Sequence, residues 1–203
     1  MSILYFHGFA SSPQSQKLVA LEKVLDIEVN APDMNVPSFE RLDFEAMVQL
    51  GIDEVARRPP RAIVGSSLGA LVALELVRRG VVAPLVLIAP AIGIGERWRS
   101  KLPAGDPIEV FNHARNARAP IHRAFFEKMT TIHPETDAPA TRVTIIMGRN
   151  DESVPFDWVR GVWEGWTRSG KLIRGSKFVE IAGGDHGLVD FVDVIAREIR
   201  TTA

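Results

Sequence analysis

Ala62-Ile63-Val64-Gly65-Ser66-Ser67-Leu68-Gly69-Ala70-Leu71-Val72-Ala73-Leu74 is the stretch of this chain that decides its fold. Its apolar, partly β-branched start predicts a buried strand, and the run of helix formers from Leu68 predicts a helix. Between them, the motif Gly-x-Ser-x-Gly is centred on Ser67. A serine on so sharp a turn needs Gly65 and Gly69 beside it, because side chains there would clash with the helix or a neighbouring strand. We therefore expect Ser67 at the helix N-terminus, where free N–H groups and the helix dipole favour negative charge.

Strands and helices alternate on both sides of this stretch. Six strands are expected, over residues 3–6, 27–29, 62–64, 85–88, 143–147 and 178–181. Helices are expected over residues 14–25, 38–58, 68–79, 156–168 and 188–199, with Ser38 as an N-cap and Gly80 as a C-cap. Strands that are apolar throughout are typical of a parallel sheet buried on both faces. The sequence thus predicts an α/β fold with a mostly parallel sheet of about six strands and helices on both faces.

Residues 92–140 interrupt this alternation, and no clear strand is expected in them. They hold four large aromatic side chains, Trp98, Phe111, Phe125 and Phe126, and three of the five histidines. So long an insertion in a compact domain is usually a lid or a binding segment. The alternative is a pair of helices that only pack. Without any repeat or linker, residues 1–203 are predicted to form one domain with a lid-like insertion.

Composition and charge exclude several kinds of protein. The chain has 24 basic and 25 acidic residues, so it offers no long-range attraction to nucleic acid or anionic lipid. It has no cysteine, which excludes disulfides, cysteine nucleophiles and thiolate metal sites. No apolar run reaches the roughly 18 residues of a membrane-spanning helix. Met1-Ser2 leads into an apolar strand without the basic flank of a signal peptide, so a cytoplasmic location is expected.

A serine hydroxyl becomes a useful nucleophile only when a base takes its proton. Ser66 is the neighbouring candidate, but the glycine spacing centres on Ser67. His186, in Gly183-Gly184-Asp185-His186-Gly187, lies between the last strand and the last helix, and its glycine neighbours let that loop fold over the site. We predict His186 as the base. The other histidines are expected at a strand end, on the surface or in lid contacts, and they are His7, His113, His122 and His133.

The third catalytic group should be a carboxylate that orients the imidazole and stabilises the imidazolium. Asp151 follows the fifth predicted strand and is our candidate. Its rivals are Glu152, which is adjacent but would point elsewhere, Asp157, which falls in the next helix, and Asp185, which is too close in sequence to His186 to reach its far ring nitrogen. The resulting order, serine then aspartate then histidine, is typical of one large class of hydrolases.

An oxyanion hole must supply N–H donors to the tetrahedral intermediate. One donor is expected to be the backbone N–H of Leu68, directly after the nucleophile. The second is expected from the loop after the first strand, and Phe9 occupies that place. Gly8 gives this loop its freedom, and we expect the ring of His7 to brace it. That role is compatible with an ordinary hydrogen-bonded histidine at a strand end.

Several of these segments resemble small bacterial esterases of the YqiA/YcfP type, in the α/β-hydrolase superfamily. The similar segments are Leu4-Tyr5-Phe6-His7-Gly8-Phe9-Ala10-Ser11-Ser12-Pro13, Ile63-Val64-Gly65-Ser66-Ser67-Leu68-Gly69, Ala89-Pro90-Ala91 and Gly183-Gly184-Asp185-His186. The resemblance spans nearly the whole chain and is weakest across residues 92–140. It implies a compact fold without the first antiparallel strands of larger relatives, and esterase or thioesterase activity without metal or cofactor. By position, it assigns the nucleophile, acid and base to Ser67, Asp151 and His186.

The predicted function is hydrolysis of carboxylic esters with small or medium acyl chains through an acyl-enzyme. Trp98, Phe125 and Phe126 are candidates to cover the acyl chain, although ordinary packing of the lid explains them equally well. A small-molecule ester or thioester is the expected partner, and the oligomeric state, a homodimer included, stays open. Acyl thioesterase and C–C bond hydrolase activity would use the same triad, and a non-catalytic binding protein of this fold is the alternative of a different class. A haloalkane dehalogenase would need aspartate at position 67.

Overall fold

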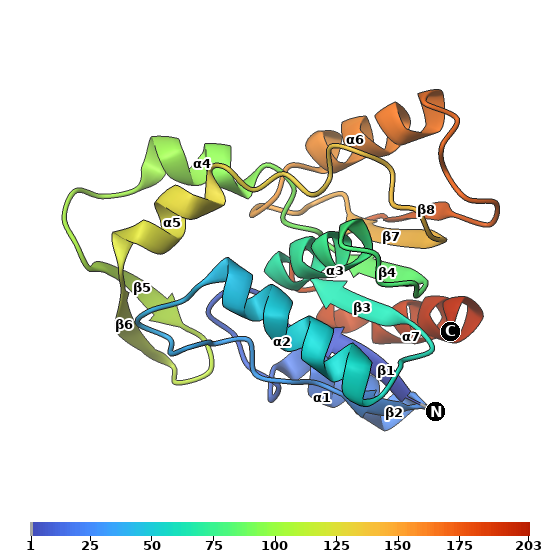
Figure 1. Ribbon diagram of the computed structural model, residues 1–203, viewed down its shortest axis with the longest axis horizontal. Coiled ribbons are helices and arrows are strands. Elements are labelled where there is room, and N and C mark those ends of the chain that lie inside the picture. Colours follow the sequence, from blue (N-terminus) through green and yellow to red (C-terminus); the bar gives the residue numbers. More distant parts are fainter. Residues whose placement is uncertain (1) are drawn as a thin grey trace.

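A parallel β-sheet forms the centre of the protein, whose computed structural model describes residues 2–203 (Figure 1). Its strands are β1 (Ser2–Phe6), β2 (Glu28–Asn30), β3 (Ile63–Ser66), β4 (Leu85–Ile88), β7 (Val143–Gly148) and β8 (Lys177–Ile181). They lie in the order β2-β1-β3-β4-β7-β8, and every neighbouring pair is parallel. The predicted fold class is therefore confirmed, and the ends of each predicted strand lie within two residues of the observed ends.

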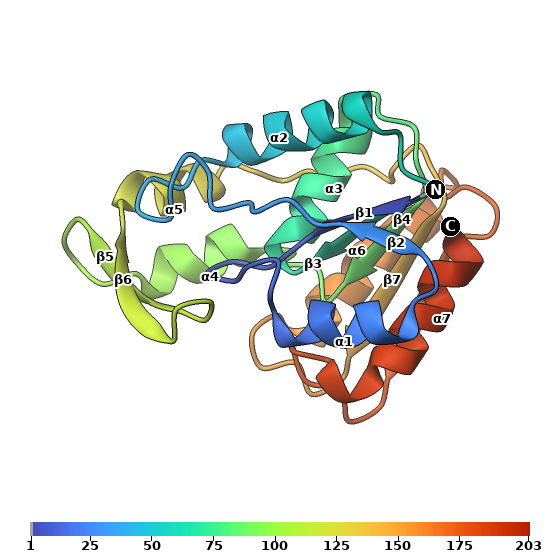
Figure 2. The same ribbon diagram turned by 90° about the horizontal axis from the view of Figure 1, so that it is seen from below.

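Helices cover both faces of this sheet, as Figure 2 shows. Their bounds are α1 (Gln16–Val24), α2 (Phe44–Arg57), α3 (Leu68–Arg78), α6 (Phe156–Arg168) and α7 (Val192–Thr202), and the short 3-10 helix η1 (Val189–Phe191) precedes α7. α1 packs with α7 on one face, and α2 packs with α3 on the other. Because both faces are covered, every residue of β1, β3, β4 and β7 is buried, which explains their continuous apolar character.

The second helix begins later than the sequence pattern predicts. α2 starts at Phe44, and the side chain of Asp43 caps it by accepting the N–H of Ala46 at 2.8 Å. Ser38, the predicted N-cap, instead accepts the N–H of Arg41 at 3.2 Å in a separate turn. The prediction of Ser38 as the cap of α2 is therefore wrong. Serine and aspartate side chains can both accept the free N–H groups at the start of a helix, but only Asp43 is followed by an uninterrupted helix.

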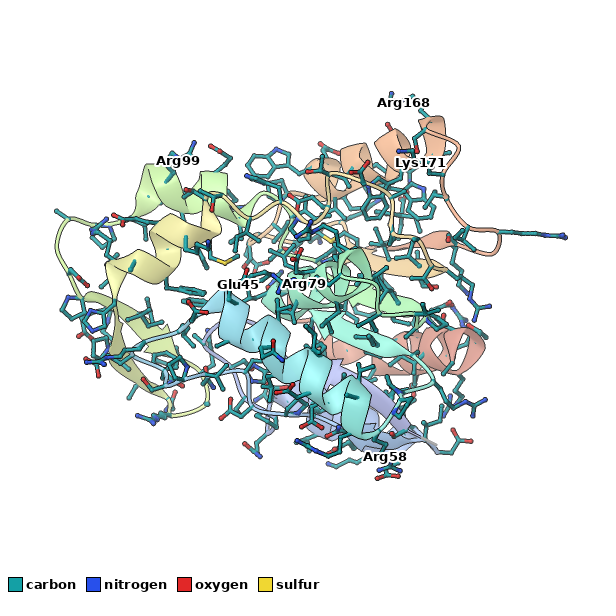
Figure 3. All side chains as sticks on the ribbon, in the orientation of Figure 1. Glu45, Arg58, Arg79, Arg99, Arg168 and Lys171 are labelled. Carbon is teal, nitrogen blue, oxygen red and sulfur yellow. The ribbon has the colours of Figure 1, made fainter. Side chains whose placement is uncertain are left out.

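A buried ionic network joins α2 to α3. Glu75 is 5% exposed and accepts hydrogen bonds from Arg78 at 2.6 Å and from Arg79 at 2.7 Å. Burial alone would raise the pKa of Glu75, but these two guanidinium groups outweigh it and lower the pKa, so Glu75 is charged. Arg79 also binds Glu45 of α2 at 2.7 Å, and Figure 3 shows the two side chains meeting between the helices. The helix that carries Ser67 at its N-terminus is thus fixed to its neighbour.

The insertion at residues 92–140 contains strands that the sequence pattern did not predict. It consists of α4 (Ile94–Lys101), β5 (Ile108–Asn112), β6 (Ala117–Ile121) and α5 (Arg123–Met129), and β5 pairs with β6 in an antiparallel hairpin. The expectation of no strand is therefore wrong. In β5 only Ile108 and Asn112 are buried, so too few apolar residues alternate to reveal a strand. Asn116 supplies the positive φ, 49°, of the hairpin turn.

The insertion lies beyond the carboxyl ends of the sheet strands, at the left of Figures 1 and 2. α4 packs against α5, and the hairpin contacts the loop after β1, where the N–H of His113 donates to the carbonyl of Ala10 at 2.9 Å. Ligands of open parallel sheets bind at the carboxyl ends of the strands, so the insertion covers the expected site. None of the helices within residues 2–203 combines the length and the apolar character needed to cross a membrane.

Candidate active site

Ser67 sits on a strained turn between β3 and α3. Its φ of 53° and ψ of −114° are unfavourable for a residue with a side chain and cost about 1–3 kcal/mol. The surrounding backbone holds it there: the Ser67 N–H donates to Ile88 at 2.9 Å, and its carbonyl accepts from Ala91 at 3.1 Å. A Cβ atom on Gly65 would lie 2.4 Å from the carbonyl oxygen of Gly69. The tight turn thus requires glycine, as the motif predicts.

His186 and Asp151 complete a chain of hydrogen bonds with Ser67. His186 Nε2 lies 3.1 Å from Ser67 Oγ, and His186 Nδ1 lies 2.8 Å from Asp151 Oδ2. The other oxygen of Asp151 accepts the N–H groups of Ser153 at 2.9 Å and Val154 at 2.7 Å. The Asp151 carboxylate is 0% exposed and the His186 side chain 24%. An ionised Asp151 keeps the imidazole proton on Nδ1, so the lone pair of Nε2 faces the serine hydroxyl.

The rival carboxylates form no hydrogen bond with His186 within residues 2–203, although Glu152 lines the smaller of two cavities beside it. Glu152 and Asp157 are exposed to solvent. Asp185 accepts the N–H of Leu188 at 2.7 Å and so orders the backbone after His186 instead of holding its ring. Among the histidines, His122 lies 3.2 Å from Asp106 in the insertion. The structure therefore brings together the three residues that the sequence singled out.

The loop after β1 passes directly over the nucleophile. A Cβ atom on Gly8 would lie 3.3 Å from the Cβ of Ser67, and one on Gly69 would lie 2.3 Å from the carbonyl oxygen of Phe6. The N–H groups of Phe9 and Leu68 have no hydrogen-bond partner within residues 2–203, and both residues line a cavity with Ser67. Free N–H groups beside a nucleophile are what an oxyanion hole requires.

His7 is buried at the end of β1, where it ties this loop to the segment after β2. Its Nε2 lies 3.0 Å from the N–H of Met34, and its Nδ1 lies 2.9 Å from the carbonyl oxygen of Gly8. The same Nε2 also lies 3.2 Å from Oδ1 of Asp33, in the same segment. His7 thus fixes the loop that carries the Phe9 N–H.

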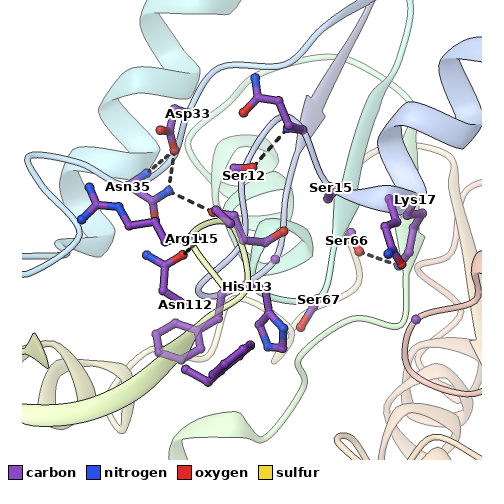
Figure 4. Close-up of a pocket in the computed structure, with 18 of the residues that line it drawn as sticks. Ser12, Ser15, Lys17, Asp33, Asn35, Ser66, Ser67, Asn112, His113 and Arg115 are labelled. Atoms are coloured by element: carbon purple, nitrogen blue, oxygen red, sulfur yellow. Dashed lines mark hydrogen bonds between the residues drawn. The ribbon is translucent and has the colours of Figure 1, made fainter. Parts of the chain in front are cut away.

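Two cavities meet at Ser67 and His186. The larger, of about 1000 Å³, lies between the loop after β1 and the β5–β6 hairpin, and it is the one drawn in Figure 4. The smaller, of about 380 Å³, lies next to α4 and is lined by Phe9, Leu68 and Trp98. His113 lines both cavities. A substrate could therefore place its two halves in different cavities, one on each side of the serine.

The aromatic residues of the insertion divide into two groups. Trp98 lines the smaller cavity, with its ring 5.1 Å from that of Phe9. Phe125 and Phe126 are 3% and 2% exposed and line neither cavity that contains Ser67. They pack against Trp98, with ring centres 5.9 Å and 5.0 Å from that of the Trp98 ring. Of the three predicted pocket residues, only Trp98 faces the site, and the two phenylalanines support it.

Sequence reasoning missed a buried polar cluster beside the nucleophile. The ammonium of Lys17 donates to Ser66 Oγ at 2.9 Å, and the buried Tyr5 lines the same cavity. Lys17 is only 8% exposed. Burial lowers the pKa of Lys17 to about 8, although the negative charges of Asp151 and Asp185 oppose the shift. The sequence did hold a signal, because Lys17 adjoins Leu18 and precedes Leu21 by one helical turn, on the buried face of α1.

One family profile covers almost the whole sequence. The family described as "Uncharacterised protein family (UPF0227)" matches residues 2–200. The chain belongs to this family. Membership confirms the family resemblance that the loop motifs indicate. No curated protein sequence matches the chain significantly.

Solved α/β-hydrolase structures share the fold of this UPF0227 member. Est1E from Butyrivibrio proteoclasticus, with bound ferulic acid, has a TM-score of 0.77 and 20% identity, over 99% of this chain and 87% of that one. Alpha/beta hydrolase domain-containing protein 10 from mouse has a TM-score of 0.73 and 18% identity, over 98% and 88%. The esterase domain of a Rhodothermus marinus protein has a TM-score of 0.71 and 15% identity, over 98% and 84%. These likenesses show that the UPF0227 member has the α/β-hydrolase fold.

Proposed function

We propose that this protein is a serine hydrolase that cleaves carboxylic esters through an acyl-enzyme on Ser67. The observation that carries the proposal is the hydrogen-bond chain of the site: Ser67 Oγ lies 3.1 Å from His186 Nε2, and Nδ1 of that ring lies 2.8 Å from buried Asp151. A nucleophile, a base within reach and a group that orients the base are the requirements of acyl transfer. The UPF0227 family and the fold shared with esterases are consistent with it.

The reaction has two halves. His186 Nε2 takes the proton of Ser67 as Oγ bonds to the ester carbonyl carbon, and the N–H groups of Phe9 and Leu68 hold the resulting oxyanion. The intermediate then breaks its bond to the alcohol oxygen, which receives the proton from His186. In the second half a water molecule, deprotonated by the same ring, attacks the acyl-enzyme. The bond between the acyl carbon and Ser67 Oγ then breaks, His186 returns its proton to Oγ, and the carboxylic acid leaves. Asp151 stabilises the imidazolium in both halves.

The two cavities suggest how the ester lies. The smaller cavity is lined by Arg97, Lys101 and Glu152 as well as by Phe9, Leu68 and Trp98. Its apolar members are suited to a small or medium acyl chain, because burial of apolar surface drives such binding. The larger cavity, which Lys17 and Arg115 also line, is left for the alcohol portion. Thioesters and carbon–carbon substrates would use the same triad and remain alternatives. A non-catalytic binding role is disfavoured, because no member of the hydrogen-bonded chain is missing.

Ser67→Ala tests the proposal. It should abolish both hydrolysis of 4-nitrophenyl acetate and butyrate and labelling by a fluorophosphonate probe, whereas Ser100→Ala, at an exposed serine of α4, should change neither. Circular dichroism checks that both variants are folded. Undiminished hydrolysis by Ser67→Ala would falsify the assignment. A panel of short and long esters, acyl-CoA thioesters and methyl ferulate then separates the remaining alternatives.

A further inference from the structure

Lys17 is a buried cation without a charged partner. Its ammonium donates to Ser66 Oγ at 2.9 Å, and no carboxylate within residues 2–203 forms an ion pair with it. An ammonium has three donors, so two are left. A buried charge without a counter-ion is costly. Asp151 and Asp185 act on the ammonium only at a distance, so no anion within residues 2–203 contacts it directly.

Lys17 also faces the site. It lines the larger cavity together with Ser67 and His186, and Figure 4 shows its bond to Ser66 next to Ser67. Arg115, in the hairpin turn, lies on the opposite side of the same cavity. A ligand in this cavity thus reaches the nucleophile and the ammonium at once.

The remaining charge in the cavity does not neutralise Lys17. Asp33 is the one carboxylate among the lining residues, and it accepts the N–H of Asn35 at 3.0 Å and its side-chain amide at 2.7 Å. Lys17 and Arg115 are the cationic lining residues. The cavity is therefore positive overall and favours a negatively charged group.

A purely structural role explains Lys17 poorly. Its one side-chain hydrogen bond within residues 2–203, to Ser66, needs only a neutral donor. Burial lowers the pKa of Lys17, so the fold alone disfavours the charge that this residue carries at neutral pH.

We propose that Lys17 binds a carboxylate on the alcohol portion of the substrate, so that the enzyme prefers acyl esters of hydroxy acids over neutral esters of the same shape. This inference rests on the proposed function, because it places the acyl chain near Trp98 and the alcohol portion in the larger cavity. The carboxylate would accept hydrogen bonds from the two free donors of Lys17, with Arg115 adding positive charge. Such charge-assisted bonds are the strong ones.

The test compares 4-butyryloxybenzoate, which carries the carboxylate, with its neutral methyl ester. The quantity compared is kcat/KM for the anionic ester divided by kcat/KM for the neutral ester. This ratio should be about ten- to a hundredfold lower in Lys17→Met than in the wild type, mainly because KM of the anionic ester rises. Lys23→Met removes the same charge from an exposed position of the same helix and should leave the ratio unchanged. An unchanged ratio in Lys17→Met, or an equal loss on both esters, would overturn the proposal.

A second measurement needs no variant. The product 4-hydroxybenzoate should inhibit the wild type at least about tenfold more strongly than methyl 4-hydroxybenzoate, since only the former offers a carboxylate to Lys17. Equal inhibition would contradict the inference. Hydrolysis of the neutral ester and fluorophosphonate labelling report on Ser67 independently. If the wild type showed neither, the proposed function itself would be refuted. That outcome is distinct from a failure of the inference about Lys17.

Discussion

The turn at Ser67 and the insertion at residues 92–140 are held in place by different means. Backbone atoms confine the turn: Cβ atoms on Gly65 or Gly69 would lie 2.4 Å or 2.3 Å from carbonyl oxygens. Inside the insertion α4 and α5 also meet closely, since a Cβ atom on Gly95 would lie 2.4 Å from the carbonyl oxygen of Met129. The insertion is joined to the loop after β1, however, by the ring contact of Trp98 with Phe9 and by single hydrogen bonds such as that from the His113 N–H to Ala10. The difference teaches that the proposed chemistry lies on the rigid part and the substrate contacts lie partly on the adaptable part.

Asp151→Asn should have the largest effect on this rigid part. The amide cannot hold His186 in the tautomer that accepts the serine proton, so kcat should fall about 10⁴-fold. The fold should persist, since the side-chain oxygen can still accept the N–H groups of Ser153 and Val154. Steady-state kinetics measure the loss, and Asp157→Asn, at an exposed position, is the control. A loss smaller than tenfold would remove Asp151 from the mechanism.

Gly69→Ala should show how tightly the turn is packed. The new Cβ would lie 2.3 Å from the carbonyl oxygen of Phe6, so β1 or α3 must shift, and the free energy of unfolding should fall by about 3 kcal/mol or more. Gly161→Ala, in α6, meets nothing within 4 Å and should stabilise by about 0.5–1 kcal/mol. Urea denaturation compares the two. Similar stabilities for both variants would contradict the steric argument.

Lys17→Met should stabilise the protein while weakening its selectivity. The pKa of Lys17 is about 8 in the folded state and 10.5 when unperturbed, so the destabilising charge is fully present below pH 8 and its effect is relieved as the pH rises to about 10.5. At pH 7 the free energy of unfolding of the variant should exceed that of the wild type by about 1–3 kcal/mol, and this difference should vanish near pH 11.

The groups around Lys17 do not change the sign of this prediction. Asp151 and Asp185 raise its pKa, but burial dominates, and Ser66 is neutral. Burial keeps Tyr5 protonated by raising its pKa. Urea denaturation of wild type and Lys17→Met at several pH values measures the difference in their free energies of unfolding. A variant less stable than wild type at pH 7 would assign Lys17 a structural role.

Trp98→Ala should give the smallest effect and tests the adaptable part. Removing the ring should lower kcat/KM for 4-nitrophenyl butyrate about tenfold and less for the acetate, because the longer chain buries more apolar surface beside it. Phe125 and Phe126 remain to support the insertion. Trp158→Ala, outside both cavities around Ser67, should leave the ratio of the two substrates unchanged. Equal losses on both substrates would separate Trp98 from the acyl chain.

Local pattern predicted the sheet and the loops at its carboxyl ends. Strands such as Leu85–Ile88 are buried on both faces, so their apolar character is visible without knowledge of their neighbours. Ser67, Asp151 and His186 follow three of these strands, and a parallel sheet brings such positions to one edge whatever the details of packing.

The β5–β6 hairpin, the start of α2 and the burial of Lys17 depended on tertiary structure. A two-stranded hairpin with few buried residues leaves little pattern in the sequence, and Ser38 and Asp43 are equivalent caps until the helix that follows is known. Lysine is usually exposed, and only the packing of α1 against the sheet, beside the cavity, buries this one. The sequence by itself determined the parallel sheet and the candidate catalytic residues, because those follow from local periodicity and chain order. Tertiary structure alone decided what surrounds them, because burial and charge pairing depend on segments far apart in the chain.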